Sequence, residues 1–397
     1  MRPSALLVAM ILWMSACGLV DMGEMTHSNN DGVWISHNWP DPLNVCYVTA
    51  LDYRNGYDWR TDKEKGTVKC SLIMYADSVP LLKIPVGSQY EVSSDPQRHR
   101  VIDGHLYTDY TDGTTTVMKK DGKELFRYGA SETVDDVLSI AGQLHTLSRP
   151  ATGAGFSYRI DGEPVVERIT GSSLGYLTSN KGTVSFCFAH EVMTEGGIVR
   201  NYYRVTGGNV SKVDLPEGVS GVWDMIVKDG CVYMIVSFDN ESIPCLLYDT
   251  TKERLSYFGA APMLSCKFIK SDSICLTMRY MHGSSGFMSD VLWLGPEKYH
   301  LYRTGCTLSS VYVDANGSNA TINSTENEDG LIFKGTRVYD MPVGYAVNIP
   351  SSIVRNDSTL FVGLMSQTGR NPILWKDGTM DTLNVNGYIT SLSMKRH

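Results

Sequence analysis

Short runs of alternating apolar and polar residues, separated by pairs of turn-forming residues, recur along most of the chain. Two such runs flank Asp121-Gly122 between Val117 and Phe126, and two more flank Asp161-Gly162 between Ser157 and Val166. An Asp-Gly pair between alternating apolar residues is the strongest short-range signal for a β-hairpin. After residue 17, no stretch has the apolar spacing of an amphipathic helix. The pattern therefore predicts an all-β protein built from hairpins.

The hairpins repeat at a regular interval. One residue taken from each turn gives a series with spacings of 40 to 46 residues: Asp77, Gly122, Gly162, Gly208, Lys252, Gly295, Gly335 and Gly378. A second strand–turn–strand unit precedes the marked hairpins, as in Arg100 to Tyr107 and Met225 to Tyr233. A period of this length, with four strands in each unit, is typical of the blades of a β-propeller. We therefore predict a β-propeller of four-stranded blades.

The number of turns favours eight blades. The first copy begins near Asn44 without a first strand of its own, while the chain ends in a strand-like run from Gly387 to Met394. We expect this C-terminal strand to complete the first blade and close the ring, because closure removes exposed sheet edges. Seven blades is the alternative, if residues 33–90 form an irregular extension.

The N-terminus has the features of an export signal. Arg2 gives the first residues a positive charge, Ala5 to Met14 is almost entirely apolar, and Ser15-Ala16-Cys17 follows. A ten-residue apolar run is too short to span a bilayer and has the length of a signal-peptide core. Two small residues before a cysteine indicate a lipoprotein signal, so we expect Cys17 to be lipidated and to anchor the chain to a membrane. The alternative is an ordinary signal peptide cleaved nearby.

These features predict three parts of the chain. Residues 1–16 form a signal peptide that is cleaved before Cys17, and residues 17–32 form a flexible tether rich in Gly, Ser, Asn, Asp and Met. Residues 33–397 form a single β-propeller domain. Several acyl chains on one cysteine are enough for stable anchoring, whereas a single chain is not.

With these motifs in place, the chain resembles the β-propeller lipoproteins of Bacteroidales-type gut bacteria. The resemblance lies in Ser15-Ala16-Cys17 and in repeated units such as Leu374 to Gly378, and it covers residues 33–397. It implies a lipid-anchored propeller in the cell envelope, as an outer-membrane lipoprotein. The segment Gly18 to Glu24 is a weak version of the acidic surface-export signal of some such proteins, so the periplasmic and surface faces both stay open.

Composition and charge narrow the possible partners. The 397 residues are 42% hydrophobic and 20% charged, which excludes a disordered, collagen-like or coiled-coil protein. The formal net charge of −8 repels a phosphate backbone, so we expect no nucleic acid partner. The basic stretch Arg98-His99-Arg100 has two interpretations, an anion site at the mouth of the ring or a solvated loop, and we favour the loop.

The cysteines have two interpretations. Eight remain after Cys17, an even number that permits disulfides in an exported protein. Cys266 and Cys275 would face each other across a hairpin, and Cys46 and Cys70 would meet in the first repeat. The alternative, favoured for at least half of them, is that they are small buried hydrophobic residues. No C-x-x-C motif occurs, so a zinc site has no support.

No catalytic or metal-binding motif has its required context. Ser173 lies in a G-x-S-x-G pattern, but the hydrolase mechanism needs that serine on a turn between a strand and a helix. Asp314 opens a run of alternating oxygen side chains, yet position twelve from it is Thr325 instead of the glutamate that a calcium loop uses. We therefore expect no catalytic residues, no metal and no cofactor.

The best candidates for ligand binding are aromatic. Flat aromatic rings beside Asp, Asn and Arg suit carbohydrate or peptide recognition, and loops on a rigid ring often carry function. The alternative is that these rings pack the N-terminal segment onto the ring. The predicted ligand-binding residues are Trp34, Trp39, Tyr53, Tyr57, Asp58, Trp59 and Arg60.

The sequence thus favours a binding protein over an enzyme, with a glycan or a partner protein bound at one rim of the ring. An alternative is an enzyme acting on polysaccharide or peptidoglycan, with carboxylates from different blades meeting at the central channel. Its candidate carboxylates are Asp109, Asp112, Asp135, Asp136 and Asp224. A second alternative is a scaffold without catalytic activity in an envelope complex, which predicts a broad exposed apolar patch.

Overall fold

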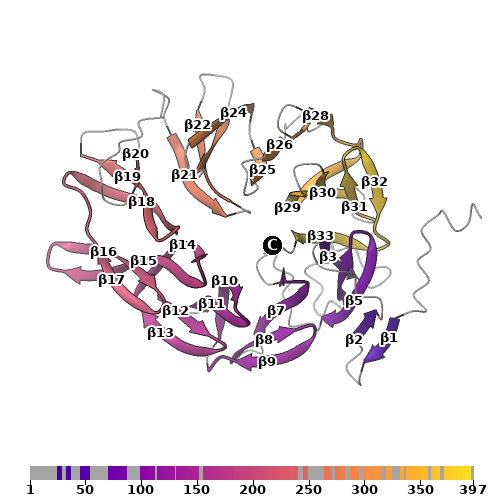
Figure 1. Ribbon diagram of the computed structural model, residues 1–397, viewed down its shortest axis with the longest axis horizontal. Coiled ribbons are helices and arrows are strands. Elements are labelled where there is room, and N and C mark those ends of the chain that lie inside the picture. Colours follow the sequence, from indigo (N-terminus) through magenta and orange to yellow (C-terminus); the bar gives the residue numbers. More distant parts are fainter. Residues whose placement is uncertain are drawn as a thin grey trace, which may run out of the picture.

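The computed structural model describes residues 25–28, 33–36, 45–53, 70–86, 99–111, 114–129, 131–151, 155–239, 245–248, 263–270, 273–281, 287–294, 299–306, 308–313, 319–323, 331–334, 337–355, 359–366 and 371–394. Within these ranges all regular structure is β-strand, so the all-β prediction is confirmed. The strands form eight sheets arranged around a common centre, the architecture of a β-propeller (Figure 1). None of the described segments is a helix long and apolar enough to cross a bilayer.

Sheet A combines strands from both ends of the chain. Its order is β1-β2-β5-β4-β3-β33, and its members are β1 (Met25–Ser28), β2 (Val33–Ser36), β3 (Cys46–Tyr53), β4 (Cys70–Ala76), β5 (Val79–Val86) and β33 (Gly387–Met394). Strand β33 pairs antiparallel with β3, from Cys46 opposite Met394 to Asp52 opposite Gly387.

Sheets B, C and D are each formed by four strands that are consecutive in the chain. Sheet B contains β6 (His99–Ile102), β7 (His105–Thr111), β8 (Thr116–Lys120) and β9 (Lys123–Arg127). Sheet C contains β10 (Glu132–Ile140), β11 (Gln143–Pro150), β12 (Phe156–Ile160) and β13 (Glu163–Ile169). Sheet D contains β14 (Gly171–Asn180), β15 (Thr183–Thr194), β16 (Gly197–Thr206) and β17 (Asn209–Val213).

Sheets E to H continue the same order along the chain. Sheet E contains β18 (Val219–Lys228), β19 (Cys231–Phe238) and β20 (Cys245–Tyr248). Sheet F contains β21 (Met263–Lys270), β22 (Ile274–Met281), β23 (Phe287–Leu294) and β24 (Tyr299–Cys306). Sheet G contains β25 (Leu308–Val313), β26 (Asn319–Asn323), β27 (Leu331–Lys334) and β28 (Arg337–Asp340), and sheet H contains β29 (Tyr345–Arg355), β30 (Thr359–Ser366), β31 (Ile373–Lys376) and β32 (Thr379–Thr382).

Five of the eight predicted turn residues lie in tight turns of the described structure. Asp77, Gly122, Gly162, Gly208 and Gly378 all lie in tight turns between the third and fourth strands of a repeat, as expected. The other three marked residues, Lys252, Gly295 and Gly335, lie outside the described residues. The turns require left-handed backbone, which Asp and Gly adopt at low cost: Asp121 has φ 49° and Gly122 has φ 81°.

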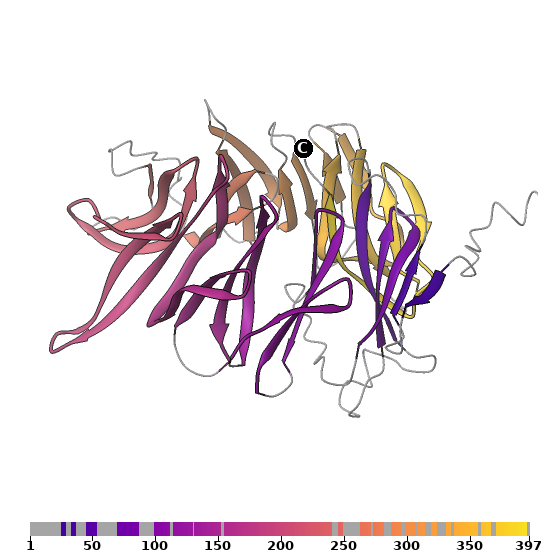
Figure 2. The same cartoon turned by 60° about the horizontal axis from the view of Figure 1, so that its bottom comes forward.

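The strand order gives the molecule two different rims. The first-to-second and third-to-fourth strand turns, such as Ala141-Gly142 and Asp161-Gly162, lie at one end of each sheet, which we call the turn rim. The second-to-third strand connections and the links between sheets lie at the other end, which we call the loop rim. The ends of β3 and β15 and the start of β10 therefore belong to the loop rim. Figure 2 shows the strands running between the two rims.

The N-terminal strands occupy the outer edge of sheet A (Figure 1). Strand β2 pairs antiparallel with β5, with Ile35 opposite Leu82, and β1 pairs antiparallel with β2. The segment expected to be a flexible tether, residues 17–32, thus includes strand β1. Strand β1 has only four residues, Met25–Ser28, which is too short for a pattern of apolar and polar residues to predict a strand from the sequence.

The apolar core lies between neighbouring sheets. Sheets C and D pack through a cluster of aromatic rings that includes Phe156, Tyr158, Phe186 and Phe188, with the Phe156 and Phe188 ring centroids 4.9 Å apart. Sheets H and A pack through Trp375, Leu364 and Ile389, among others. Offset and tilted ring pairs of this kind stabilise a core beyond the area that they bury. These contacts hold each sheet against its neighbour and fix the positions of the rims.

Candidate functional site

Buried polar side chains are concentrated in sheets B and C. In most proteins such groups are rare and hydrogen-bonded, so a concentration of them marks the first place to look for chemistry. Of the buried polar residues that the structure describes, Thr49, Ser185, Thr390 and Ser391 lie in other sheets. Those in sheets B and C are His99, Thr108, Asp109, Thr116, Glu132, His145, Thr146, Ser148, Ser157 and Arg159.

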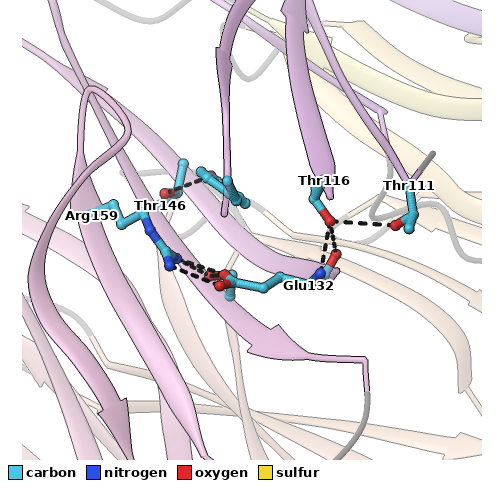
Figure 3. Close-up of polar contacts among 7 residues, drawn as sticks. Thr111, Thr116, Glu132, Thr146 and Arg159 are labelled. Atoms are coloured by element: carbon cyan, nitrogen blue, oxygen red, sulfur yellow. Dashed lines mark hydrogen bonds and ion pairs between the residues drawn. The ribbon is translucent and has the colours of Figure 1, made fainter. Parts of the chain in front are cut away.

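At the centre of this cluster is a buried ion pair. Glu132 is at the start of β10 and Arg159 is in β12, and each side chain is 5% exposed. The guanidinium is bidentate: Nη1 donates to Oε2 of Glu132 at 2.6 Å and Nη2 donates to Oε1 at 2.8 Å (Figure 3). Ser148 of β11 donates to Oε2 and accepts a second bond from Nη1. A bidentate pair with satisfied neighbours is the geometry in which a buried charge is tolerated.

The same cluster joins sheet B to sheet C. The backbone N–H of Glu132 donates to Oγ1 of Thr116 in β8, and that hydroxyl donates to the Glu132 carbonyl oxygen at 2.6 Å (Figure 3). Tyr128, in the link between the sheets, lies with its ring 4.5 Å from the Arg159 guanidinium and donates its hydroxyl to Thr146. Burial raises the pKa of Tyr128 to about 12, so its hydroxyl stays a hydrogen-bond donor.

This arrangement is suited to structure more than to catalysis. Both carboxylate oxygens of Glu132 accept hydrogen bonds from Arg159, and the Arg159 guanidinium is also stacked on an aromatic ring. A general acid or base needs a proton that substrate can reach, and a nucleophile needs an exposed atom. The cluster extends from Glu132, at the loop-rim end of β10, into sheet C, and its hydrogen bonds with Thr116 fix the link between sheets B and C.

Two of the carboxylates considered as catalytic candidates, Asp136 and Asp224, have structural roles. Asp136 accepts the N–H of Val137 and, at 2.7 Å, the N–H of Leu177 in the next sheet. Asp224 accepts the N–H of Met225 and, at 2.9 Å, the N–H of Phe268 in the next sheet. Each aspartate follows a bulge in the first strand of its sheet, which turns the side chain toward the neighbouring sheet.

The other three candidate carboxylates differ in environment. Asp135 pairs with the exposed Arg149 at 2.6 Å, Asp109 is buried in β7, and Asp112 lies outside the described residues. Burial raises the pKa of Tyr176, on β14, to about 12, and the negative charges of Asp224 and Asp136 contribute to this increase. Across the residues that the structure describes, no three His, Cys, Asp or Glu side chains are grouped as metal ligands would be.

The predicted aromatic binding residues fall mostly outside the described residues. Trp39, Tyr57, Asp58, Trp59 and Arg60 are among these, and for Trp34 the structure gives only its backbone position in β2. Tyr53 is described, and it is 3% exposed at the end of β3, with its ring 6.4 Å from that of Tyr388. Tyr53 is therefore packed between β3 and β33 within sheet A.

The remaining candidate sites from the sequence are the possible serine nucleophile, the calcium loop and the basic stretch. Ser173 lies within β14, opposite Phe188, and the turn-to-helix context of a hydrolase is missing there. The calcium-loop candidate at Asp314 lies outside the described residues. In the basic stretch, the Arg100 guanidinium donates to the carbonyl oxygens of Val134 and Asp135, and His99 is buried. His99 and Arg100 are thus not presented to an anion.

The disulfide prediction is wrong for both pairs. Cys46, Cys70, Cys266 and Cys275 form no disulfide with one another. In the hairpin Cys266 is opposite Met278 and Cys275 is opposite Ile269. Cys46 is the first residue of β3, whereas Cys70, in β4, is opposite Tyr53 at the other end of β3. Their environment is apolar, and burial raises the pKa of the Cys70 and Cys275 thiols to about 12. The alternative, that the cysteines are small buried hydrophobic residues, is correct for these four.

An exposed feature of the loop rim was not predicted. Strands β15 and β16 continue beyond their neighbours: β14 pairs with β15 only as far as His190, and β17 pairs with β16 only as far as Tyr202. Residues 191–200 therefore form a two-stranded ribbon, which we call the β15–β16 ribbon. Its apolar side chains are exposed on both faces: Val192 37%, Met193 77%, Ile198 60% and Val199 47%.

The signal for the ribbon was present in the sequence. Glu191-Val192-Met193-Thr194 and Ile198-Val199-Arg200 flank Glu195-Gly196-Gly197, a pattern of two short strands and a turn. In the structure Met193 is opposite Ile198, Val192 is opposite Val199, and Arg200 pairs with Glu191 at 2.9 Å. Trp223, in the middle of β18, is also 42% exposed. Other exposed apolar side chains, such as Val79 and Met380, lie near the turn rim, so the loop rim is distinguished by the four neighbouring apolar side chains of the ribbon.

Comparisons with known proteins give similarities of fold. No protein-family model matches the chain, and no curated protein matches it. Among solved structures, the β-propeller domain of the Trilobed protease from Pyrococcus furiosus is 8% identical with a TM-score of 0.44, over 74% of this chain and 93% of that one. The extracellular domains 1–2 of Drosophila Semaphorin 1a are 8% identical with a TM-score of 0.35, over 77% and 88%. A quinonprotein alcohol dehydrogenase-like protein from Bacteroides thetaiotaomicron is 10% identical with a TM-score of 0.32, over 89% of both chains.

Proposed function

We propose that this chain is an exported, lipid-anchored binding protein of the cell envelope, with an eight-bladed propeller that β33 closes by completing the first blade. The signal-like N-terminus ending in Ser15-Ala16-Cys17 supports export and lipidation. The eight sheets and the pairing of β33 with β3 support the blade number and the closure. The ligand is a glycan or a partner protein, bound at the loop rim.

The observation that carries this proposal is the β15–β16 ribbon. A monomeric protein seldom exposes neighbouring apolar side chains on an extended element without a use for them. Met193 and Ile198 are the most exposed, at 77% and 60%, and they face the same side of the ribbon. A strand pair with apolar side chains and free backbone edges is suited to contact with another polypeptide. The ribbon therefore favours a partner protein over a glycan.

The enzyme hypothesis has less support. Glycosidases need two carboxyl groups about 5 to 9.5 Å apart and open to the substrate. Asp136 and Asp224 instead accept backbone N–H groups of neighbouring sheets, and Glu132 is neutralised by Arg159. Carboxylates outside the described residues stay available to that hypothesis, as does a scaffold role that uses the exposed apolar ribbon.

A thermal-shift screen of residues 33–397 separates these functions. Polysaccharides, oligosaccharides, muropeptides and divalent cations are tested first, since a ligand at about 100 times its dissociation constant stabilises the fold by about 2.7 kcal/mol. A glycan that shifts the wild type but not the Tyr57→Ala/Trp59→Ala variant supports the glycan hypothesis and the predicted aromatic site. Turnover of that glycan would replace the binding proposal with the enzyme hypothesis.

A second experiment tests for a protein partner. A photo-crosslinking residue replaces Ile198 in the ribbon or Ala141 on the turn rim, and crosslinking is carried out in intact envelopes. We expect a discrete adduct from position 198 that is lost when Met193 is changed to Ser, and none from position 141. Adducts of equal intensity from both positions would contradict a binding surface on the loop rim.

A further inference from the structure

The direction of the N-terminal strands determines the rim from which the anchor leaves the propeller. Strand β5 begins at Val79, next to the Asp77-Ser78 turn, and so runs from the turn rim toward the loop rim. Strand β2 is antiparallel to β5, and β1 is antiparallel to β2. Strand β1 therefore runs in the same direction as β5, and its first residue lies on the side of the turn rim.

The register places this first residue more closely. Met25 is opposite Ser36, and Ile35 is opposite Leu82, so Ser36 is level with Leu81. Leu81 is the third residue of β5, and at about 3.4 Å per residue this level is about 7 Å from the start of the strand. The rest of β5, from Leu81 to Val86, leads away from this point toward the loop rim over about 17 Å.

The chain length before β1 limits how far the anchor can lie from it. Cys17 precedes Met25 by eight residues, which span at most about 28 Å when fully extended. A membrane at the turn rim is within easy reach of this segment. If the membrane were at the loop rim, the same segment would first have to run about 17 Å along the outer edge of sheet A. About 11 Å of its length would then extend beyond that rim.

The β15–β16 ribbon opposes the loop-rim arrangement. It continues past His190, the last residue of β15 that pairs with β14, by four residues to Thr194, which is about 14 Å of strand. With the loop rim against a bilayer, the ribbon would occupy the space that the anchor leaves. Glu195, at its exposed tip, would then be brought to the membrane surface, where burying a carboxylate is costly.

We propose that the propeller is held with its turn rim toward the membrane and its loop rim, with the β15–β16 ribbon, facing away from it. This inference rests on the proposed lipidation of Cys17. It makes the lipid headgroup surface the neighbour of the turn rim, and it leaves the proposed binding surface open to a partner that approaches from the aqueous side. The membrane-embedded part of a partner in the same bilayer would not reach the ribbon.

The test uses two probe positions in a single sheet. A coumarin-bearing residue replaces Lys181, in the turn of sheet D at the turn rim, or Glu195, in the turn of the same sheet at the loop rim; both are exposed. The two positions are in turns at opposite ends of β15, one at the turn rim and one at the loop rim, so the proposed orientation predicts different heights above the bilayer. Full-length lipidated protein is reconstituted into vesicles of phosphatidylethanolamine and phosphatidylglycerol with an acceptor dye on the headgroup.

We expect energy transfer to the headgroup dye to be several times greater from position 181 than from position 195. The Cys17→Ser variant should stay in solution and show no transfer from either position. Equal transfer, as for a ring standing on its edge, or greater transfer from position 195 would overturn the proposed orientation and leave the anchor intact. Wild-type protein that fails to float with the vesicles would overturn the anchor, and the orientation with it.

Discussion

At the scale of single residues, an aspartate in the turn between the third and fourth strands of a repeat is bound to the second strand through two hydrogen bonds. In sheet B, the N–H of Asp121 donates to the carbonyl oxygen of Leu106, and its Oδ1 accepts the Leu106 N–H at 2.8 Å. The carboxylate thus extends the ladder between the two strands by one pair. The same two bonds are made by Asp77 with Cys46, by Asp161 with Leu144 and by Asp377 with Leu360.

Sheet D has no aspartate at the corresponding turn position, so adding one there tests whether this carboxylate stabilises the fold. Gly207 has the left-handed φ of 55° and donates to the carbonyl oxygen of Val184, but it has no side chain to accept the Val184 N–H. A Cβ there would meet Thr183 Cγ2 at 3.5 Å, an ordinary contact. We expect Gly207→Asp to be more stable than Gly207→Ala by about 1 to 2 kcal/mol, because only Asp adds the hydrogen bond. Chemical unfolding measures the difference, and equal midpoints would contradict this role of the turn aspartates.

His99 makes the stability of the fold depend on pH. It is 5% exposed, neither ring nitrogen has a hydrogen-bond partner among the described residues, and burial, helped by Arg100, lowers its pKa to about 4. The His99 imidazole therefore binds a proton below about pH 6.5 in the unfolded chain, but only below about pH 4 in the folded chain. We expect this residue to destabilise the fold progressively between these values, by about 3 kcal/mol at the acid end.

The matched variant for this prediction is His99→Met, which removes the titrating group and fills similar space. Wild type and variant are unfolded with urea at pH 7, 5.5 and 4.5. The difference in free energy of unfolding should move in favour of the variant as the pH falls. A difference that stays constant over this range would show that His99 is not protonated on unfolding.

At the scale of strands and sheets, the Glu132–Arg159 pair connects elements that the sequence keeps apart. Removing one partner of a buried ion pair leaves an uncompensated charge, which costs about 3 to 5 kcal/mol. We expect Arg159→Met to be destabilised by this amount in chemical unfolding, and Glu132→Gln/Arg159→Met to recover part of it because no charge stays buried. The control is Arg127→Met, whose partner Glu124 is 46% exposed and whose loss should cost less than about 1 kcal/mol.

The same scale shows what the sequence can and cannot predict. The turns at Asp121-Gly122 and Asp161-Gly162 are local signals, so the strands beside them were predictable. Thr116, Glu132 and Arg159 come from three strands, and no local pattern indicates that they meet. The register shift beside Asp136 likewise turns its carboxylate toward Leu177 in another sheet, which alternation alone does not predict. The ribbon had a local signal, but its exposure depends on the shorter β14 and β17.

At the scale of the whole molecule, the ends of the chain meet in sheet A. The Thr49 hydroxyl of β3 is bonded to those of Thr390 and Ser391 in β33, and all three residues are buried. Gly387, at the start of β33, is so close to β3 that a Cβ there would overlap the carbonyl oxygen of Leu51. Apolar residues of β33 also pack against sheet H, so this strand contributes to two sheet contacts. Its displacement would expose the backbone edge of β3 and the apolar side chains of sheet H that pack against it.

Gly387→Ala tests whether this pairing holds the whole propeller together. The added methyl group forces β33 away from β3, since the obstacle is backbone and not a movable side chain. We expect a destabilisation of about 1 to 3 kcal/mol, typical of overpacking at a fixed position, with protease cleavage appearing near both chain ends before the sheets between them. The matched control is Gly221→Ala in β18, also an inner strand, where a Cβ meets nothing within 4 Å. If both variants unfold at the same midpoint and are cleaved at the same sites, the β3–β33 pairing is dispensable and the sheets are held by their neighbours alone.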